Sequence, residues 1–192
     1  MSLEETRQKI LEAARKVFAE KSFFDATLED VAHRSGVKKS TIYYYFKSKL
    51  DLLMEIVHEV LEELAVTLDA NLPKGDVREI LTSLVDCYCD FFSQKSDLFV
   101  VFQRAAFDLL SHKEACGYFQ EVIQKFRDLQ RKIAESIGSI TTKKGKQIPG
   151  DAVLRVVTSS IWGYCMEEVR EGRTITEGDR EFLKEVFTAF LA

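Results

Sequence analysis

Five basic side chains and three consecutive tyrosines lie between residues 34 and 49, a stretch without any acidic residue. The basic residues are Arg34, Lys38, Lys39, Lys47 and Lys49. Lysine and arginine neutralise phosphates, and basic or hydroxyl side chains can bind base edges in the major groove. These residue types therefore indicate non-covalent recognition of double-stranded DNA.

The elements that would present these side chains are two short helices, predicted at about 28–35 and 39–45. Val31 and Ile42 supply apolar anchors by which the two helices pack against each other. Gly36 lies between the helices and can adopt the positive φ that a sharp turn needs. This is the spacing of a helix-turn-helix, whose second helix enters the DNA major groove.

No constellation of catalytic residues stands out elsewhere in the sequence. Carboxylates fall mostly on polar helix faces, and serine, histidine and aspartate form no triad pattern. The run 143–146 superficially suggests a phosphate-binding loop. However, Gly138 and Gly145 are separated by six residues instead of four, and Gln147 replaces the required Ser or Thr. We therefore expect no enzyme activity, no metal and no cofactor.

Four cysteines are present, at Cys87, Cys89, Cys116 and Cys165, without a metal-type C-x2-C pair. The three histidines are scattered. Two interpretations of the cysteines remain: reduced thiols in the core of a cytosolic protein, or a redox sensor.

The composition favours a single globular, helical class. Of the 192 residues 46% are hydrophobic and only two are proline, so a substantial core and an all-α fold are expected. Residues 1–50 hold ten Lys and Arg and seven Asp and Glu, whereas residues 51–192 hold 17 and 24. A basic end can bind DNA while the acidic remainder limits indiscriminate DNA coating. Without a signal peptide or a long apolar run, we expect a cytoplasmic protein with no membrane contact.

Helical periodicity extends over the rest of the chain. The first helix is predicted near 4–21, with Ile10, Ala14, Val17 and Phe18 on one stripe. The later helices are predicted at about 49–72, 76–92, 97–110, 112–137, 151–170 and 177–191, with a polar loop at 138–150. The helix at 49–72 joins the N-terminal helices to the rest and could serve as a lever or as a plain strut.

The middle helices are rich in aromatic side chains, for which two interpretations stay open. Singly, each fits a packed core; collectively, they could line an apolar pocket between helices, a common ligand site in all-α proteins. The predicted ligand-binding residues are Tyr88, Phe91, Phe92, Phe99, Phe102, Gln103, Phe107, Phe119 and Trp162.

The last two predicted helices carry more apolar surface than one body needs, including Trp162 and Phe187. Such a surplus is typical of a subunit interface, so a homodimer through these two helices is expected. The alternative is that the same faces close the core of a monomer.

The helix-turn-helix and its flanks resemble the TetR family of bacterial transcription regulators. The positions that carry the resemblance are Arg7, Ile10, Ala14, Phe18, Thr27, Val31, Ala32, Gly36, Val37, Thr41, Ile42, Tyr43, Phe46, Lys49, Leu52 and Leu53. The resemblance covers the first quarter of the chain. Ser22 and Leu50 depart from it, since a glycine and an acidic residue are usual there.

The resemblance implies roles for individual residues. Lys39, Ser40, Tyr43 and Tyr44 would reach base edges, and Thr27, Tyr45 and Lys49 would hold phosphates. Lys38 could serve either purpose, and Thr41 belongs to the same DNA-binding set. Tyr45 fits packing inside the N-terminal helices equally well.

The sequence thus predicts an all-α protein with a helix-turn-helix domain at 1–48 and an effector-binding and dimerisation domain at 49–192. The expected function is that of a homodimeric repressor, released from a pseudo-palindromic DNA operator by a small hydrophobic effector. The alternative is a helical ligand-binding or scaffold protein with a vestigial DNA-binding head. The sequence does not distinguish repression from activation.

Overall fold

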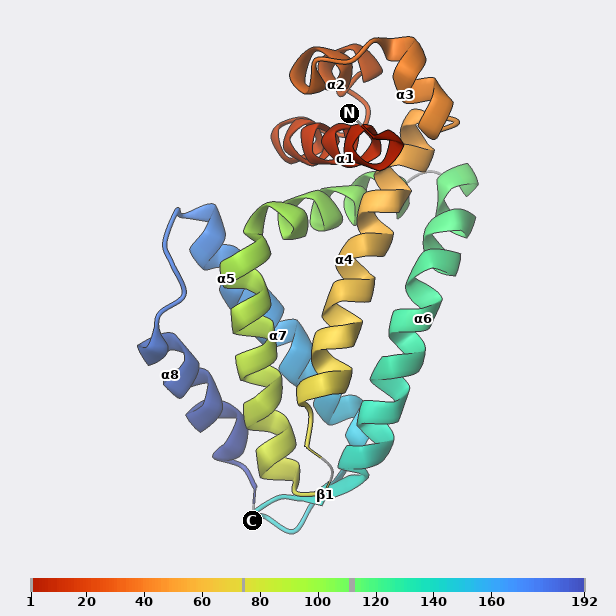
Figure 1. Ribbon diagram of the computed structural model, residues 1–192. Coiled ribbons are helices and arrows are strands. Elements are labelled where there is room, and N and C mark those ends of the chain that lie inside the picture. Colours follow the sequence, from red (N-terminus) through yellow and green to blue (C-terminus); the bar gives the residue numbers. More distant parts are fainter. Residues whose placement is uncertain (1, 74, 111–112, 192) are drawn as a thin grey trace. The chain divides into compact units, whose positions relative to one another are not determined.

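The computed structural model describes residues 2–73, 75–110 and 113–191, with the backbone alone at 96, 109, 110, 113–123 and 125. Within these ranges, eight helices and one two-stranded antiparallel hairpin follow one another along the chain (Figure 1). The predicted all-α class is confirmed, with the hairpin as an addition. No helix of the described ranges is long and apolar enough to cross a membrane.

The chain divides into two compact units. The first consists of Met1–Leu61 together with Asp97–Gln124, and the second of Glu62–Ser96 together with Lys125–Ala192. The helix-turn-helix therefore shares its unit with a segment from the middle of the chain. This division differs from the predicted boundary at residue 48.

Helix α1 spans Leu3–Glu20 and begins at a capping box. The Ser2 hydroxyl accepts the Glu5 N–H, and the Glu5 carboxylate accepts the Ser2 N–H. The buried stripe of α1, which packs on α2, contains Ile10, Leu11, Ala13, Ala14, Val17 and Phe18. It includes all four predicted stripe residues, because their spacing of three and four places them on one face.

Helices α2 (Leu28–Ser35) and α3 (Lys39–Tyr45) form the predicted helix-turn-helix. Gly36 has φ 68 and ψ 20, the left-handed conformation that a side chain would strain. Val31 and Ile42 are fully buried, as the anchors of the two helices should be. With its inner side fixed in this way, α3 exposes its opposite face.

Helix α4 spans Lys49–Asn71, and Ser48 caps it as predicted by accepting the Asp51 N–H at 3.0 Å. The Asp51 carboxylate in turn accepts the Lys47 N–H at 2.9 Å. Asp51 therefore supplies the negative charge at the helix N-terminus that Leu50 does not.

Helix α5 spans Val77–Leu110 but is kinked at Lys95, whose φ of −134 and ψ of 33 are not helical. The kink separates two helical segments where the sequence predicts two helices. Asp76 caps the start of α5 as predicted, accepting the Arg78 N–H at 2.7 Å. The kink also adjoins the boundary between the two units, which follows Ser96.

Helix α6 (Lys113–Ile137) ends before Gly138, which has φ 65, as the sequence predicts. Helix α7 (Gly150–Arg170) begins close to that end. A Cβ added at Gly150 would lie 2.3 Å from the backbone oxygen of Ala134. This close approach of two backbones therefore requires glycine.

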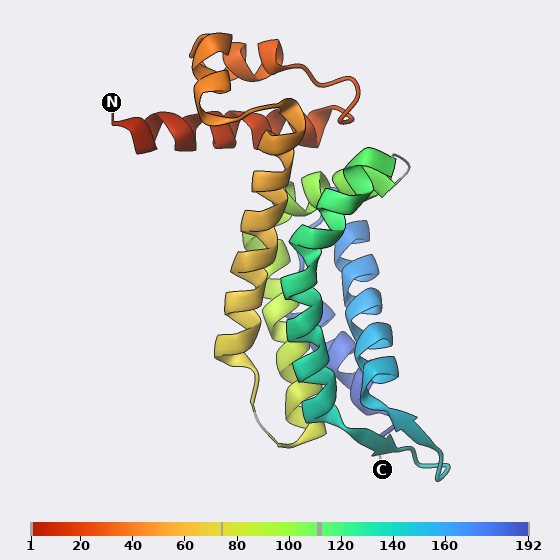
Figure 2. The ribbon, with the colours of Figure 1, turned by 90° about the vertical axis from the view of Figure 1, so that its right-hand side faces the viewer.

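The predicted polar loop between α6 and α7 is wrong, because part of it forms a β-hairpin (Figure 2). Strands β1 (Ser139–Thr141) and β2 (Gln147–Pro149) pair antiparallel, with Ile140 opposite Ile148. Strands of three residues are too short to show the alternation by which strands are recognised in a sequence. Burial of Ile140 gives the hairpin an apolar contact.

Helix α8 (Glu177–Thr188) lies beside the first half of α5 and ends before the predicted limit at residue 191 (Figure 1). Two basic side chains of α8 fix it there. Arg180 pairs with Asp90 at 2.6 Å, and Lys184 pairs with Asp86 at 2.9 Å. This packing belongs entirely to the second unit.

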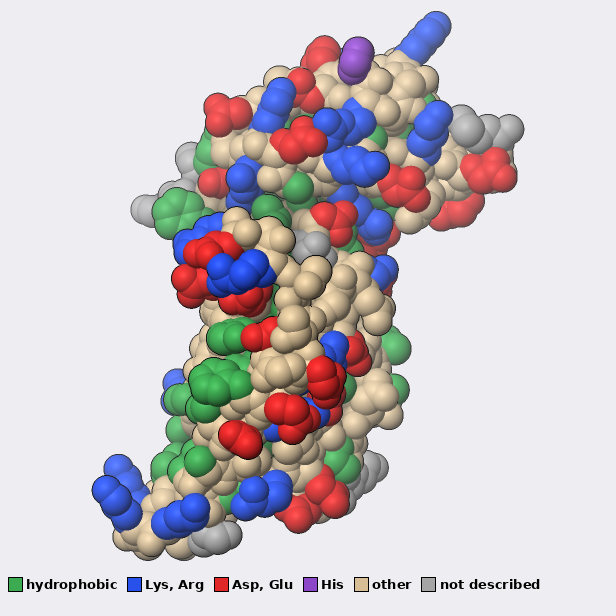
Figure 3. All heavy atoms as spheres, turned by 90° about the vertical axis from the view of Figure 1, so that its left-hand side faces the viewer, with side chains coloured by type: hydrophobic (Ala, Val, Ile, Leu, Met, Phe, Trp, Pro, Cys, Tyr) green, Lys and Arg blue, Asp and Glu red, His purple; other side chains and the backbone are tan. Residues whose placement is uncertain are grey.

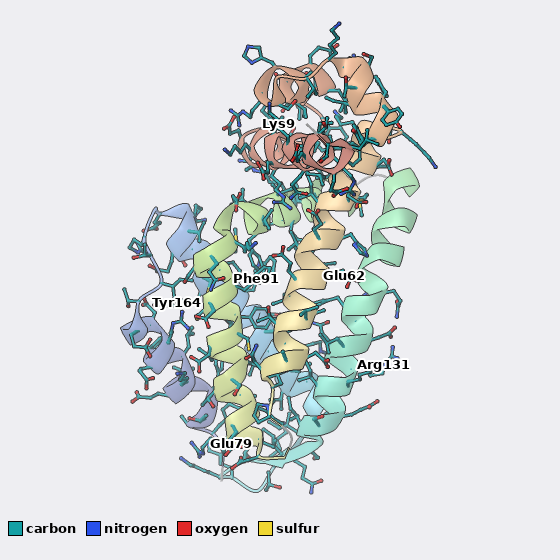
Figure 4. All side chains as sticks on the ribbon, in the orientation of Figure 1. Lys9, Glu62, Glu79, Phe91, Arg131 and Tyr164 are labelled. Carbon is teal, nitrogen blue, oxygen red and sulfur yellow. The ribbon has the colours of Figure 1, made fainter. Side chains whose placement is uncertain are left out.

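Helices α7 and α8 are joined by a hydrogen bond from the Tyr164 hydroxyl to Asp179 Oδ1, at 2.5 Å (Figure 4). Asp179 also completes the α8 capping box with Thr176. The bond to Asp179 is the main reason why the pKa of Tyr164 is raised to about 12. One carboxylate thus ends one helix and docks it on another.

Candidate nucleic-acid interface

The outer face of α3 carries polar and aromatic side chains that are not used inside the protein. Lys39, Ser40, Tyr43 and Tyr44 are all exposed, and the Tyr44 side chain is 73% exposed. They sit one side of the helix because positions i, i+1, i+4 and i+5 share a face. The structure therefore brings together the four residues predicted to read base edges.

The remaining predicted residues of α3 lie at the margin of this face. Lys38, the N-cap residue, is exposed, and Thr41 is half-buried. Tyr45 is half-buried with its ring edge-on to Tyr44, at 5.0 Å between centroids. Phe46 is buried, as expected for the core of the head.

Lys39 does not stand alone on this face. Its ammonium group donates to Glu29 Oε1 on α2 at 2.5 Å, in an ion pair between exposed side chains. The bond with Glu29 raises the pKa of Lys39, and the same bond lowers the pKa of Glu29. Sequence reasoning missed Glu29, although its place two residues after Thr27 was a signal for an acidic group near the reading helix.

Thr27 has a structural role as the N-cap of α2. Its hydroxyl accepts the Asp30 N–H at 3.1 Å and donates to Asp30 Oδ2 at 2.8 Å. The hydroxyl is exposed, but both of its hydrogen-bonding functions are already engaged. Its predicted contact with a phosphate stays a prediction.

Lys49 lies deeper than a phosphate clamp should. Its ammonium group donates to the backbone oxygens of Phe23 at 2.5 Å and Ala26 at 2.7 Å, and lies 4.5 Å from the centre of the Phe23 ring. Burial lowers the pKa of Lys49. We therefore revise the expected role: Lys49 holds the loop between α1 and α2, which the sequence alone could not show.

The same loop is bound from the opposite end of the first unit's sequence. The Phe23 N–H donates to Asp108 Oδ2 at 2.8 Å, and Asp108 belongs to the second segment of α5. Phe23 is thus held by its N–H to α5 and by its carbonyl to α4. The loop leads directly into Thr27 and α2.

A shallow hollow of about 340 Å³ lies beside the reading face. It is lined by Phe24, Ala26, Thr27, Leu28, Lys39, Tyr43, Lys47, Ser48 and Lys49. Four of these residues are among the predicted DNA contacts. Lys47 was counted with the basic residues but given no role, and its exposed ammonium group faces this hollow as a further candidate for phosphate binding.

Charges on the head are balanced rather than gathered into one basic field. Figure 3 shows acidic and basic side chains interspersed over the side of the head that it displays. Arg34 makes a two-pronged pair with Glu20 at 2.7 and 2.8 Å, and Lys21 pairs with Asp30 at 2.8 Å. Some of the basic charge predicted for DNA is therefore compensated within the head.

Residues 10–56, which include the helix-turn-helix, match the family model described as bacterial regulatory proteins, tetR family. The HTH-type transcriptional regulator AcrR of Shigella flexneri is 28% identical over 171 residues, which cover 84% of this chain and 75% of that protein. The chain belongs to the TetR family.

The similarity to other TetR-family proteins is strongest in the head. The regulator SrpR of Pseudomonas putida is 41% identical over 54 residues, which cover 28% of this chain and only 25% of SrpR. The second curated relative is likewise covered over only 40% of its own length. The structure of FadR from Bacillus subtilis, solved in complex with stearoyl-CoA, has a TM-score of 0.75 at 19% identity, over 96% of this chain and 99% of that one. That likeness shows the fold of the body.

The predicted effector residues of this TetR-family protein divide between the two units. Tyr88, Phe91, Phe92 and Trp162 belong to the second unit, where Phe92 and Trp162 meet edge-on at 5.4 Å. Tyr88 is buried, which raises its pKa. These contacts fit both open interpretations, a packed core and a pocket wall.

The other predicted effector residues belong to the first unit. Phe99 is fully buried and Phe102 is half-buried. Phe107 is 83% exposed and Gln103 is exposed, so the expectation that they face inward is wrong for this chain. Residues 98, 101 and 105 take the inner side of the helix instead. The side chain of Phe119 lies outside the described residues.

A surface hollow of about 380 Å³ lies in the second unit. It is lined by Glu62, Glu63, Val66, Thr67, Phe91, Gln94 and Lys95. Figure 4 labels Glu62 on α4 and Phe91 on α5. Lys95, at the kink, pairs with Glu63 at 3.1 Å. Apart from Phe91, its walls are not those predicted for the effector.

The terminal helices of the TetR-family body divide their apolar residues between core and surface. Phe187 is buried within its own chain, so its expected place on a surplus face is wrong. Trp162 is half-buried against Phe92. The apolar side chains left exposed are Val156 on α7 and Phe182 and Val186 on α8.

The described cysteines, Cys87, Cys89 and Cys165, are all buried and unpaired. Burial raises the pKa of Cys87 to about 11, which keeps that thiol protonated. Cys89 and Cys165 contact each other by a hydrogen bond between α5 and α7. Cys116 lies outside the described side chains. Among the described residues, no group of His, Cys, Asp and Glu could hold a metal ion.

Proposed function

We propose that this TetR-family protein is a homodimeric repressor that binds a pseudo-palindromic operator and is released by a small, largely apolar effector. The observation that carries the DNA-binding part is the outer face of α3, where Lys39, Ser40, Tyr43 and Tyr44 are exposed above the buried anchor Ile42. Side chains of this kind on a second helix read base edges in the major groove.

The flank of the reading face supports contacts with the DNA backbone. Lys38 and Lys47 are exposed basic residues at either end of α3. Phosphate contacts fix the register of a head on the duplex without reading its sequence. In this proposal Lys38 and Lys47 bind phosphates, and Lys49 keeps the neighbouring loop in place.

A homodimer explains the exposed apolar side chains of α7 and α8. Val156, Phe182 and Val186 are 63%, 54% and 46% exposed, and small exposed residues on α7 would let another helix approach closely. Those small residues are Ser159, Ser160 and Gly163. Two copies of the pair would form a four-helix bundle and hold two reading helices about 34–36 Å apart, one turn of DNA.

The effector response rests on the aromatic body and on the contacts of Phe23. A ligand among apolar side chains of the middle helices would alter the second segment of α5. That segment contacts the head through Asp108, which binds the N–H of Phe23. A ligand that binds a different head arrangement better would shift the population away from DNA by no more than its differential affinity.

The first test is selection of binding sites from a random duplex pool, followed by fluorescence anisotropy and light scattering. We expect enrichment of a two-fold symmetric site bound by two protomers. Failure to bind any duplex, even at low salt, would favour the helical ligand-binding or scaffold protein with a vestigial head. A reporter gene behind the selected site then separates repression from activation.

The effector is tested by a thermal-shift screen of hydrophobic compounds, with operator affinity measured for each hit. We expect ligands that raise thermal stability to weaken operator binding about 5- to 150-fold, the usual range of such coupling. Stabilising ligands that leave operator affinity unchanged would contradict the proposed response, but not the DNA binding.

A further inference from the structure

The ion pair between Glu29 and Lys39 links the helix before the turn to the first residue of the reading helix. Glu29 Oε1 and Lys39 Nζ are 2.5 Å apart, and the two side chains are 66% and 43% exposed. A phosphate and the Glu29 carboxylate are alternative partners for the same ammonium group. The pair therefore bears directly on what Lys39 can do at a DNA surface.

Glu29 is not needed to form its own helix. The capping box of α2 uses Thr27 and Asp30, and Asp30 also takes the Lys21 ammonium group. Glu29 is thus left to pair with Lys39. A purely structural explanation of this carboxylate would be helix-dipole stabilisation in the first turn, which needs no lysine on α3.

The neighbouring cations Lys38 and Lys47 differ from Lys39. Both are exposed, and within the described residues neither makes an ion pair with a carboxylate within 4.0 Å. Phosphate attraction at the ends of α3 is therefore available from these two residues. The cation with the carboxylate partner is the one on the face that reads bases.

We propose that Glu29 is a specificity-determining positioning residue, which holds Lys39 toward the base edges and away from phosphates. This inference rests on the proposed DNA-binding function. A lysine has three N–H donors, so Lys39 can keep its bond to Glu29 and still donate to acceptors such as O6 and N7 of guanine. To reach a phosphate it must leave Glu29, and the Glu29 carboxylate itself repels phosphates.

The consequence differs for the two kinds of DNA. Binding to non-specific DNA consists almost entirely of phosphate contacts, so Glu29 weakens it by withholding one contact per protomer. Binding to the operator keeps the pair and gains base contacts. Glu29 therefore widens the ratio between operator affinity and non-specific affinity.

The test compares Glu29→Gln with the unaltered protein on a random-sequence duplex and on the selected operator, between 50 and 200 mM salt. Each added phosphate contact strengthens the fall in affinity over this range by about threefold, or about tenfold for a dimer. We expect Glu29→Gln to steepen the fall on the random duplex by that factor and to bind it more tightly at 50 mM. Operator affinity should stay unchanged or decrease.

Glu20→Gln is the matched control, because it breaks the similarly exposed Glu20–Arg34 pair and changes the net charge equally. It should alter the affinity ratio much less. Adding Lys39→Met to Glu29→Gln should abolish the gain on random DNA, since Lys39 makes the new contact. Glu29→Asp, which keeps the carboxylate, should restore much of the ratio.

Three results would overturn the inference: equal effects of Glu29→Gln and Glu20→Gln, a parallel change on both duplexes, or a gain that survives Lys39→Met. Circular dichroism melting of each variant checks that the head remains folded. If the unaltered protein binds neither duplex, it is the proposed function that fails. An unaltered protein that discriminates, with a Glu29→Gln variant of the same ratio, would overturn the role of Glu29 alone.

Discussion

The reading face of α3 and the loop between α1 and α2 each contain a lysine with several partners within reach, yet the two lysines are fitted for different tasks. Lys39 is exposed and its partner is a carboxylate on the surface. Lys49 is half-buried, and its partners are the backbone oxygens of Phe23 and Ala26. A side-chain partner can be exchanged for DNA, whereas backbone carbonyls inside a fold cannot leave.

The comparison shows that a basic residue next to a reading helix is not by itself a DNA contact. Both lysines match family positions, and both were expected to face DNA. Only burial and the identity of the acceptor separate them. The loop region should therefore respond to mutation mainly in stability, and the α3 face mainly in DNA binding.

The largest effect is expected from Lys49→Met, which keeps the aliphatic stem and removes the donors. Two charge-assisted hydrogen bonds are lost and two carbonyls lose their partner, so the free energy of unfolding should fall by about 2 kcal/mol. Chemical denaturation monitored by circular dichroism measures it. Lys47→Met is the control, because that neighbouring lysine is exposed. Similar losses in both variants would remove the distinction between the two regions.

A smaller effect is expected from Asp108→Ala. The Phe23 N–H loses a partly buried acceptor, which should cost about 1 kcal/mol. Hydrogen exchange at the Phe23 amide should accelerate, because its protection depends on that bond. Asp97→Ala, at the other end of the same α5 segment, should leave this amide unchanged. Unchanged exchange in Asp108→Ala would mean that α5 does not hold the loop.

Tyr44→Ala tests the reading face. The ring is mostly exposed, so the free energy of unfolding should change by no more than about 0.5 kcal/mol. The preference among variants of the selected operator should nevertheless change, because an exposed ring on α3 can contact bases. Quantitative binding to a set of single-base operator variants measures this. A uniform loss on every variant would assign Tyr44 to the DNA backbone instead.

Much of the head could be predicted because its signals are local. The stripe of α1, the turn at Gly36 and the cap at Ser48 each depend on residues within a few positions. The outward face of α3 then follows from helical spacing once Ile42 is recognised as buried. The family pattern adds the identity of the fold, as residues 10–56 show.

What could not be predicted depends on contacts between distant residues. The bond from Phe23 to Asp108 joins positions 85 apart in sequence, and Lys49 is 26 residues from Phe23. Phe107 and Phe187 look alike as apolar residues on amphipathic helices, yet one is 83% exposed and the other is buried. Burial on a helix with apolar residues on several sides is decided by the tertiary packing, which periodicity does not contain.

The smallest effect concerns Asp30, whose carboxylate, unlike that of its neighbour Glu29, is used for structure. Asp30 accepts the Lys21 ammonium group at 2.8 Å, the Thr27 hydroxyl at 2.8 Å and the Thr27 N–H at 2.9 Å. These bonds lower the pKa of Asp30 from 3.8 to about 2. Because the folded pKa lies below the unfolded one, the stabilisation is complete above the unfolded value and is lost as the pH falls from about 4 to about 2. The loss should be small, since exposed charges are screened by solvent and salt.

An NMR titration of the Asp30 carboxyl group, with the α2 amides as reporters, measures this acid response. Asp30→Asn should remove it and leave the operator preference unchanged, because the carboxylate caps α2 and does not hold a reading side chain. Glu29→Gln should give the reverse pattern, with little change in acid response and a change in DNA discrimination. A midpoint for Asp30 near its ordinary 3.8 would show that the cap does not depend on its charge. The two adjacent acidic residues would then not divide the structural and recognition tasks between them.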